Sequence, residues 1–89
     1  GLFAYRQDPT YSALNRFVFQ PYCSRCHTER FSSYAALTRG TMWVWPGYPG
    51  RSWVYTATES RAMPPAQEQP QDEEIAAIEE WIRAGAPEN

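Results

Sequence analysis

The string Cys23-Ser24-Arg25-Cys26-His27 constrains this chain more than any other feature. Cysteines three positions apart lie on the same side of one helical turn, so both thiols can react with one edge of a single bound group. Such a string arises by chance only about once in a thousand chains of this size at ordinary residue frequencies. It is typical of covalent haem attachment, in which the two thiols add to the haem vinyl groups and the adjacent histidine binds the iron.

Two other chemistries use a Cys-x-x-Cys pair. A cytosolic thiol-redox pair stands at a helix start after a strand in an α/β fold, and no strand is predicted before Cys23. A zinc site needs a fourth ligand from a second cysteine or histidine cluster, whereas this chain holds two cysteines and one histidine. The residues therefore favour haem attachment over both.

The 89 residues fit one domain, 1–89. A chain this short buries only roughly 60–65% of the surface that its unfolded form exposes, so its stability is marginal without cross-links or a cofactor. A single cysteine pair cannot supply a disulfide framework. Aromatic residues make up 16% of the chain, including Trp43, Trp45, Trp53 and Trp81. This content suits the lining of a large flat ligand, which again favours a prosthetic group.

All eight basic residues are arginines. Residues 1–51 hold six arginines and two acids, net +4, whereas residues 52–89 hold two arginines and eight acids, net −6. This asymmetry can orient a charged partner, although solvated charges on surface helices produce the same pattern. No basic run indicates nucleic-acid binding, and no apolar run approaches the roughly 18 residues of a membrane span. Because Gly1 opens the chain without a signal peptide or an initiator methionine, we expect a processed mature protein or a domain cut from a longer one.

The apolar pattern predicts three or four short helices and no strand. Apolar residues at three- and four-residue steps predict an amphipathic helix over 11–22, which Pro21 should end or bend. A second helix is expected over 31–37, stopped at Gly40. Residues 41–50 are predicted to form a loop. Because this loop holds three large aromatic residues, we expect it to pack against another part of the molecule.

Two helices are expected in the second half of the chain. Ser52 should cap a short helix over 53–57 by accepting a backbone N–H with its hydroxyl, and the prolines after Met63 enforce an extended segment. The last helix has acids at 72–74 near its positive end, an isoleucine stripe, and stop signals at Gly85 and Pro87.

The second axial iron ligand has to come from elsewhere in the chain. Without a second histidine or a third cysteine, a methionine is the natural soft donor, which leaves Met42 and Met63. Met63 precedes Pro64 and Pro65, which fix the backbone and can aim the thioether, whereas Met42 has only a short path from His27 around the haem edge. We therefore expect Met63 as the ligand and Met42 as a packing residue of the aromatic loop.

The chain resembles small bacterial class I c-type cytochrome domains. The resemblance rests on the Cys-x-x-Cys-His string after an N-terminal helix, on Met63-Pro64-Pro65, on residues 46–55 (Pro-Gly-Tyr-Pro-Gly-Arg-Ser-Trp-Val-Tyr) and on residues 74–87, and it covers about residues 14 to 87. It implies an all-α fold of three to four short helices wrapped around one covalently bound haem. It also implies crossing terminal helices, with Phe19 on the first and Ile78 and Trp81 on the last.

The resemblance implies further site residues. Pro46 corresponds to the loop proline whose carbonyl receives the proximal imidazole N–H, a bond that fixes the ring of His27. The tryptophan-rich loop and the absence of lysine depart from the pattern, which puts a lysine-ringed docking surface in doubt.

A haem iron bound by His27 and Met63 has six ligands, which predicts a one-electron carrier rather than an enzyme. Trp43, Trp45, Trp53 and Tyr55 are expected to form an aromatic wall that excludes water, and Arg51 or an indole N–H to hold a haem propionate. Plain packing or a solvated arginine is the alternative for each of these residues. The alternative functions are a haem enzyme or gas sensor with a displaceable methionine, and the electron-entry domain of a larger oxidoreductase.

Thioether formation needs an export-side assembly system, so we expect a periplasmic protein. Its expected partners are redox proteins, and its expected state is a monomer.

Overall fold

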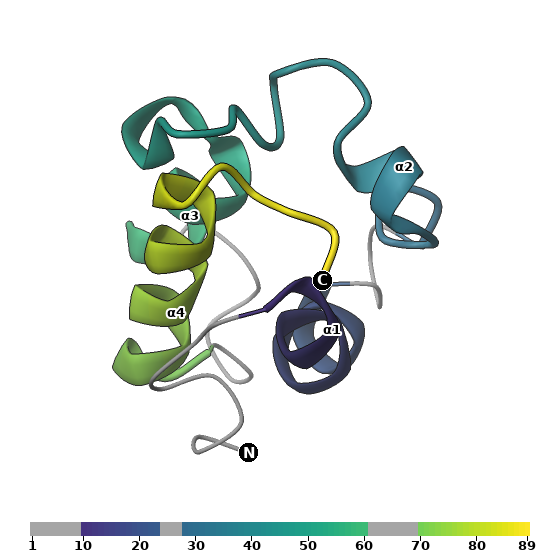
Figure 1. Ribbon diagram of the computed structural model, residues 1–89. Helices are drawn as coiled ribbons and strands as arrows, with labels where there is room; N and C mark the ends of the chain where they lie inside the picture. Colours follow the sequence, from purple (N-terminus) through teal and green to yellow (C-terminus); the bar gives the residue numbers. More distant parts are fainter. Residues whose placement is uncertain (1–9, 24–27, 61–69) are drawn as a thin grey trace.

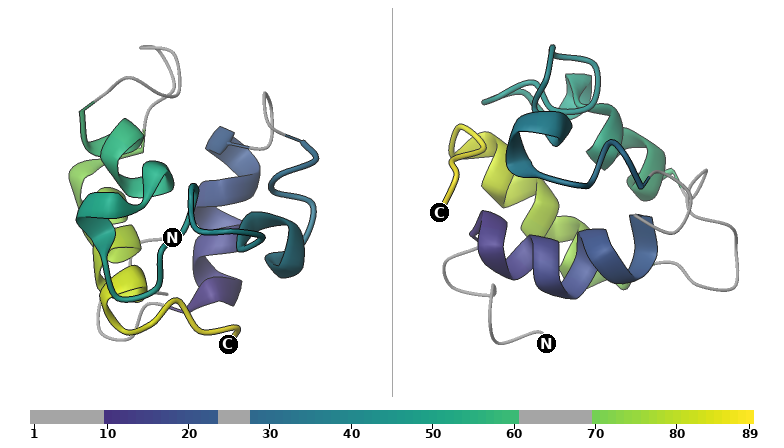
Figure 2. Two further views of the ribbon diagram at one scale, coloured as in Figure 1. Left: turned by 90° about the horizontal axis from the view of Figure 1, so that it is seen from above. Right: turned by 90° about the vertical axis from the view of Figure 1, so that its right-hand side faces the viewer.

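The computed structural model describes residues 10–23, 28–60 and 70–89. These ranges form the helices α1 (Tyr11–Leu14), η2 (Asn15–Cys23), α2 (Tyr34–Leu37), η3 (Pro49–Arg51), α3 (Trp53–Glu59) and α4 (Asp72–Arg83). The described ranges contain no strand, which agrees with the expected all-α class, and none of their helices is long and apolar enough to cross a membrane. Figure 2 (left) shows α3 and α4 on one side of the molecule and the N-terminal helix on the other.

The N-terminal helix consists of α1 and η2, which follow each other without a break (Figure 2, right). Thr10 begins it by accepting the backbone N–H of Ala13 at 3.1 Å. Leu14, Val18 and Phe19 are fully buried, as the amphipathic pattern predicts. The sequence predicts an end or bend at Pro21, yet the helix continues to Cys23 because η2 winds as a π-helix.

This wider winding explains how proline is tolerated. In an α-helix the proline ring clashes with the carbonyl four residues earlier and removes the hydrogen bond to it. A π-turn instead pairs each N–H with the carbonyl five residues back, and Pro21 lies inside such a stretch. The change of winding, rather than a stop, therefore brings Cys23 into the helix.

Helix α2 is shorter than expected. The sequence predicts a helix over 31–37, but the α-helix begins at Tyr34, where Ser33 accepts the backbone N–H of Ala36 at 3.0 Å. Phe31 precedes this cap and is buried. Gly40 has φ +72°, the left-handed conformation expected at the end of this segment.

Helix α4 matches its prediction most closely. Gln71 and Glu74 form a reciprocal capping box at its start, and the isoleucine stripe (Ile75, Ile78 and Ile82) is buried. Gly85 follows the helix with φ +102°, and the N–H of Ala86 donates to the carbonyl of Trp81 at 2.9 Å. These features are a Schellman-type C-cap, so local signals alone specify both ends.

The first and last helices cross, as expected. Figure 1 views the N-terminal helix end-on, while the axis of α4 runs in the plane of the page. The ring of Phe19 packs against the indole of Trp81 with centroids 5.9 Å apart, and Ile78 is fully buried beside them in the same core. The C-terminal segment then returns over the molecule to α1, where the Asn89 side-chain oxygen accepts the N–H of Tyr11 at 2.9 Å.

Candidate haem-binding site

Cys23 is the one residue of the Cys-x-x-Cys-His string that the structure describes. It is the last residue of η2 and is 8% exposed, within the cluster of buried apolar side chains that includes Phe31 and Trp43. Cys26 and His27 lie outside the described residues, as does Met63. A group attached to the Cys23 sulfur would therefore lie against an apolar, partly aromatic interior.

Burial raises the pKa of the Cys23 thiol from 9.0 to about 12. Thiol-disulfide exchange and zinc binding both use the thiolate, and reactive cysteines have a lowered pKa. The surroundings of Cys23 oppose that ionisation. They fit a thiol that becomes a neutral thioether better than a redox or zinc-binding thiolate.

Trp43 is the buried member of the expected aromatic wall. Its ring meets Phe31 edge-on at 5.8 Å and Trp53 at 4.7 Å, and the guanidinium carbon of Arg30 stands 5.4 Å from its centroid. Arg30 also donates to the Ala36 carbonyl at 3.0 Å. These contacts join Trp43 to the segment after the cysteine string on one side and to α3 on the other.

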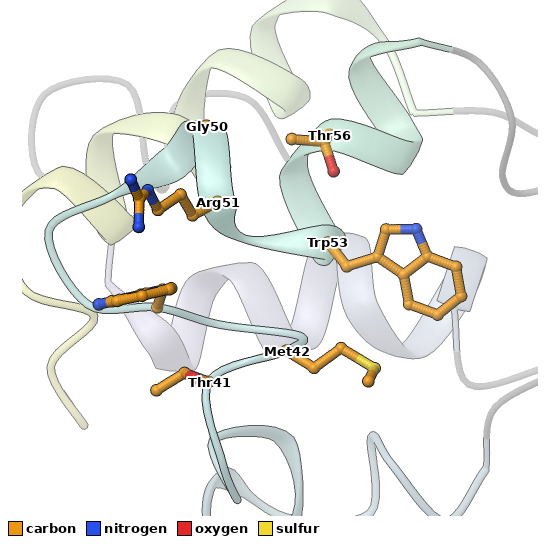
Figure 3. A pocket seen from close by; sticks show the side chains of 7 residues that line it. Thr41, Met42, Gly50, Arg51, Trp53 and Thr56 are labelled. Carbon is orange, nitrogen blue, oxygen red and sulfur yellow. The ribbon is translucent and has the colours of Figure 1, made fainter.

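Two other expected wall residues, Trp45 and Trp53, line a hollow on the surface. It has a volume of about 540 Å³, and its walls come from the loop after α2, from η3 and from α3: Thr41, Met42, Trp45, Gly50, Arg51, Trp53 and Thr56. The Arg51 guanidinium carbon lies 5.0 Å from the centre of the Trp45 ring. Figure 3 shows Met42 and Trp53 at one end of this hollow and Arg51 at the other. Trp53 is 43% exposed here.

The backbone around the hollow is fixed by Ser52. The sequence predicts that its hydroxyl caps α3, but this fully buried hydroxyl accepts the N–H of Trp45 at 2.8 Å and donates to the carbonyl of Tyr48 at 2.9 Å. The first backbone N–H groups of α3 donate instead to carbonyl oxygens of the loop that follows α2. Trp53 donates to the Met42 carbonyl at 3.0 Å, and Val54 donates to the Trp43 carbonyl at 3.0 Å.

Three expected residues have other surroundings. Tyr55 is half-buried against the apolar core, and burial, aided by Glu79, raises its pKa. Pro46 is exposed, while the N–H of the next residue, Gly47, donates to the Ile82 carbonyl at 2.7 Å. Met42 is 69% exposed, so its expected role in packing the aromatic loop is wrong. Its backbone carbonyl accepts the first N–H of α3, while its side chain lies at the surface.

Some residues of this region were not identified from the sequence. Phe31 links Phe19 to Trp43, with ring centroids 5.3 Å and 5.8 Å away. Tyr48 packs on Trp45 at 5.8 Å. Arg30 stacks on Trp43 as well, but an arginine near an aromatic residue is too common in sequence to reveal a tertiary stack. The position of Tyr48 between two prolines and two glycines was the one local signal.

The described residues include no group of three or more histidine, cysteine or acidic side chains that could hold a metal ion. No protein-family model, no curated protein and no solved structure matches this chain.

Proposed function

We propose that this chain is a one-electron carrier of the c-type cytochrome kind. One haem is attached covalently through Cys23 and Cys26, with His27 and Met63 as the axial ligands of its iron. The observation that carries the proposal is the string of residues 23–27 in a chain with no other histidine or cysteine. When bound, the haem supplies a one-electron iron couple.

The surroundings of Cys23 support the attachment. Its thiol stands at the end of a helix, inside an apolar cluster, with a pKa that burial raises to about 12. A thioether needs no charge and is compatible with such surroundings, whereas a zinc ligand or a redox thiolate would need compensation for its charge.

The arrangement around Trp43 supports a water-poor interior. Phe31 and Trp43 lie in the same buried cluster as Cys23, and α3 is anchored there through Val54. Burial of the redox group lowers the local dielectric, which with a thioether ligand favours the reduced iron. The proposed roles of this chain's own residues are therefore to attach the haem, to bind its iron from both faces of the ring and to exclude water.

Two measurements, mass spectrometry and absorption spectroscopy, test the proposal. The protein is made in a host with an export-side haem-attachment system and, in parallel, in one without it. Mass spectrometry of the denatured protein from the first host should give the chain plus one haem, and the reduced protein should show the absorption spectrum of a six-coordinate haem. The matched variant Cys23→Ala combined with Cys26→Ala should lose the covalent adduct.

Two outcomes would contradict different parts of the proposal. Haem that acid and organic solvent remove from the wild type would mean that the thioether bonds are absent. A wild-type spectrum without any haem would remove the carrier function altogether. The periplasmic location is part of the proposal and follows from the need for export-side attachment.

A further inference from the structure

The exposed large apolar side chains of the described ranges come from one short segment. Met42 is 69% exposed, Tyr48 57% and Trp53 43%, and all three belong to residues 42–53. Met42 and Trp53 line the hollow described above, and Tyr48 packs on Trp45, which lines it too. Tryptophan, tyrosine, methionine and arginine are the residue types enriched at the centres of protein interfaces.

This surface is held by internal hydrogen bonds rather than by a loose loop. The Met42 carbonyl binds the first N–H of α3, and the Ser52 hydroxyl joins the backbones of Trp45 and Tyr48. The backbone that carries these apolar side chains therefore needs little further ordering when a partner binds. Preorganisation of this kind favours binding.

The described lining of the hollow carries a positive charge. Arg51 is the single charged side chain among the described residues that line it. Its guanidinium stacks on Trp45 at 5.0 Å, a contact that leaves the N–H groups at its edge able to donate to a carboxylate. A partner that fits this hollow therefore combines an apolar surface with a carboxylate.

The same surface is connected to the interior. The exposed Trp53 ring lies 4.7 Å from the buried Trp43 ring, and Trp43 shares the apolar cluster of Cys23. We propose that the Met42–Trp53 face is where a redox partner protein docks, with a carboxylate of the partner on Arg51, and where one electron is exchanged. This inference rests on the proposed function. No bond forms or breaks and no proton moves, because the partner is itself a one-electron metalloprotein.

A chemically defined surface can replace the unidentified partner. The probe is a gold electrode coated with a mixed monolayer of carboxylate-terminated and methyl-terminated alkanethiols, and the comparison electrode carries amine-terminated and methyl-terminated thiols. A quartz crystal microbalance gives the affinity of the haem-loaded protein, and cyclic voltammetry gives its electron-exchange rate. The wild type should bind the carboxylate surface with a reversible haem current and bind the amine surface weakly.

The variants locate the face. Arg51→Glu and Trp53→Ala should each weaken binding to the carboxylate surface about tenfold, the size expected for a central interface residue, and should slow exchange. Arg16→Glu is the matched control, because it makes the same charge change at an exposed residue of η2 that does not line the hollow. It should keep binding and current close to those of the wild type.

The outcomes separate this inference from the proposed function. A wild type with an intact haem spectrum whose binding falls equally in Arg51→Glu and Arg16→Glu, or does not fall in Trp53→Ala, would overturn the docking face alone. Tight binding through this face without a haem current would overturn the electron-exchange role. A wild type without haem would overturn the proposed function and this role with it, and the absorption spectrum reports that directly.

Discussion

The ring of Phe19 meets the indole of Trp81 at 5.9 Å and an interplanar angle of 62°, with both side chains fully buried. Trp81 also receives the ring of Tyr11 at 6.0 Å and donates its indole N–H to the Pro87 carbonyl at 2.9 Å. The contact joins the first helix to the last, and the hydrogen bond ties α4 to the C-terminal segment. Trp81 is therefore the residue on which the crossing of the terminal helices depends most.

Substituting Trp81 by Ala should lower the free energy of unfolding by about 3–5 kcal/mol, because it leaves a cavity between two helices. Trp53→Ala is the internal control: its indole is 43% exposed, and its loss should cost about 1 kcal/mol or less. Chemical denaturation followed by circular dichroism measures both. A loss below about 1 kcal/mol for Trp81→Ala would show that Trp81 is not the central residue of the crossing.

Ser52→Ala should destabilise the protein more than removal of a surface cap. The substitution leaves the Trp45 N–H and the Tyr48 carbonyl without this buried partner, which costs about 2–3 kcal/mol. The matched variant Ser33→Ala removes the exposed cap of α2 and should cost about 1 kcal/mol. Thermal unfolding of the two variants gives the comparison. Equal losses would mean that the Ser52 hydroxyl acts only as a helix cap.

The sequence predicts α4 well because the determinants of this helix are local or strongly periodic, whereas the crossing of the terminal helices was expected from the resemblance. The acids near Gln71, the isoleucine stripe and Gly85 each act within the helix itself. The role of Ser52 could not be predicted, because the partners of its hydroxyl are set by the return of the loop from Trp45. The continuation of the helix past Pro21 was missed as well, since it depends on π-winding that the apolar pattern does not specify.

The candidate site, too, could be predicted from the sequence only in part. The proposed chemistry of Cys23, Cys26 and His27 rests on residue type and spacing, and the structure adds the burial of Cys23. The grouping of Trp45, Arg51 and Trp53 around one hollow was anticipated only as an aromatic wall. The outward position of their side chains depends on tertiary hydrogen bonds that no spacing rule encodes.

The thiol of Cys23 should be poorly reactive in the folded, haem-free chain. Burial raises its pKa from 9.0 to about 12, so folding favours the protonated form. At pH 9 about half of the unfolded chains should carry the thiolate, but only a very small fraction of the folded chains should do so. Alkylation of Cys23 by iodoacetamide at this pH, located by mass spectrometry, should therefore be much slower than in denaturant.

The same shift gives a pH dependence of stability. A group whose pKa is raised on folding contributes stability that is complete below the unfolded value and is lost as the pH rises toward the folded value. For Cys23 this window runs from pH 9.0 to about 12. The loss should be absent in the haem-loaded protein, where a thioether cannot ionise. Equal alkylation in folded and denatured chains would show that the thiol is accessible.

Met63 lies outside the described residues, and its assignment as the sixth ligand depends on Pro64, Pro65 and the lack of other soft donors. Met63→Ala should abolish the weak far-red band of thioether-bound ferric haem, lower the potential and let carbon monoxide bind freely, because the ligand that closes the distal face is gone. Met42→Ala is the control and should leave all three properties nearly unchanged, because this side chain is 69% exposed on the outer hollow. Loss of the band in Met42→Ala and its retention in Met63→Ala would reverse the assignment. Ready binding of carbon monoxide by the wild type would replace the carrier with a gas sensor or haem enzyme.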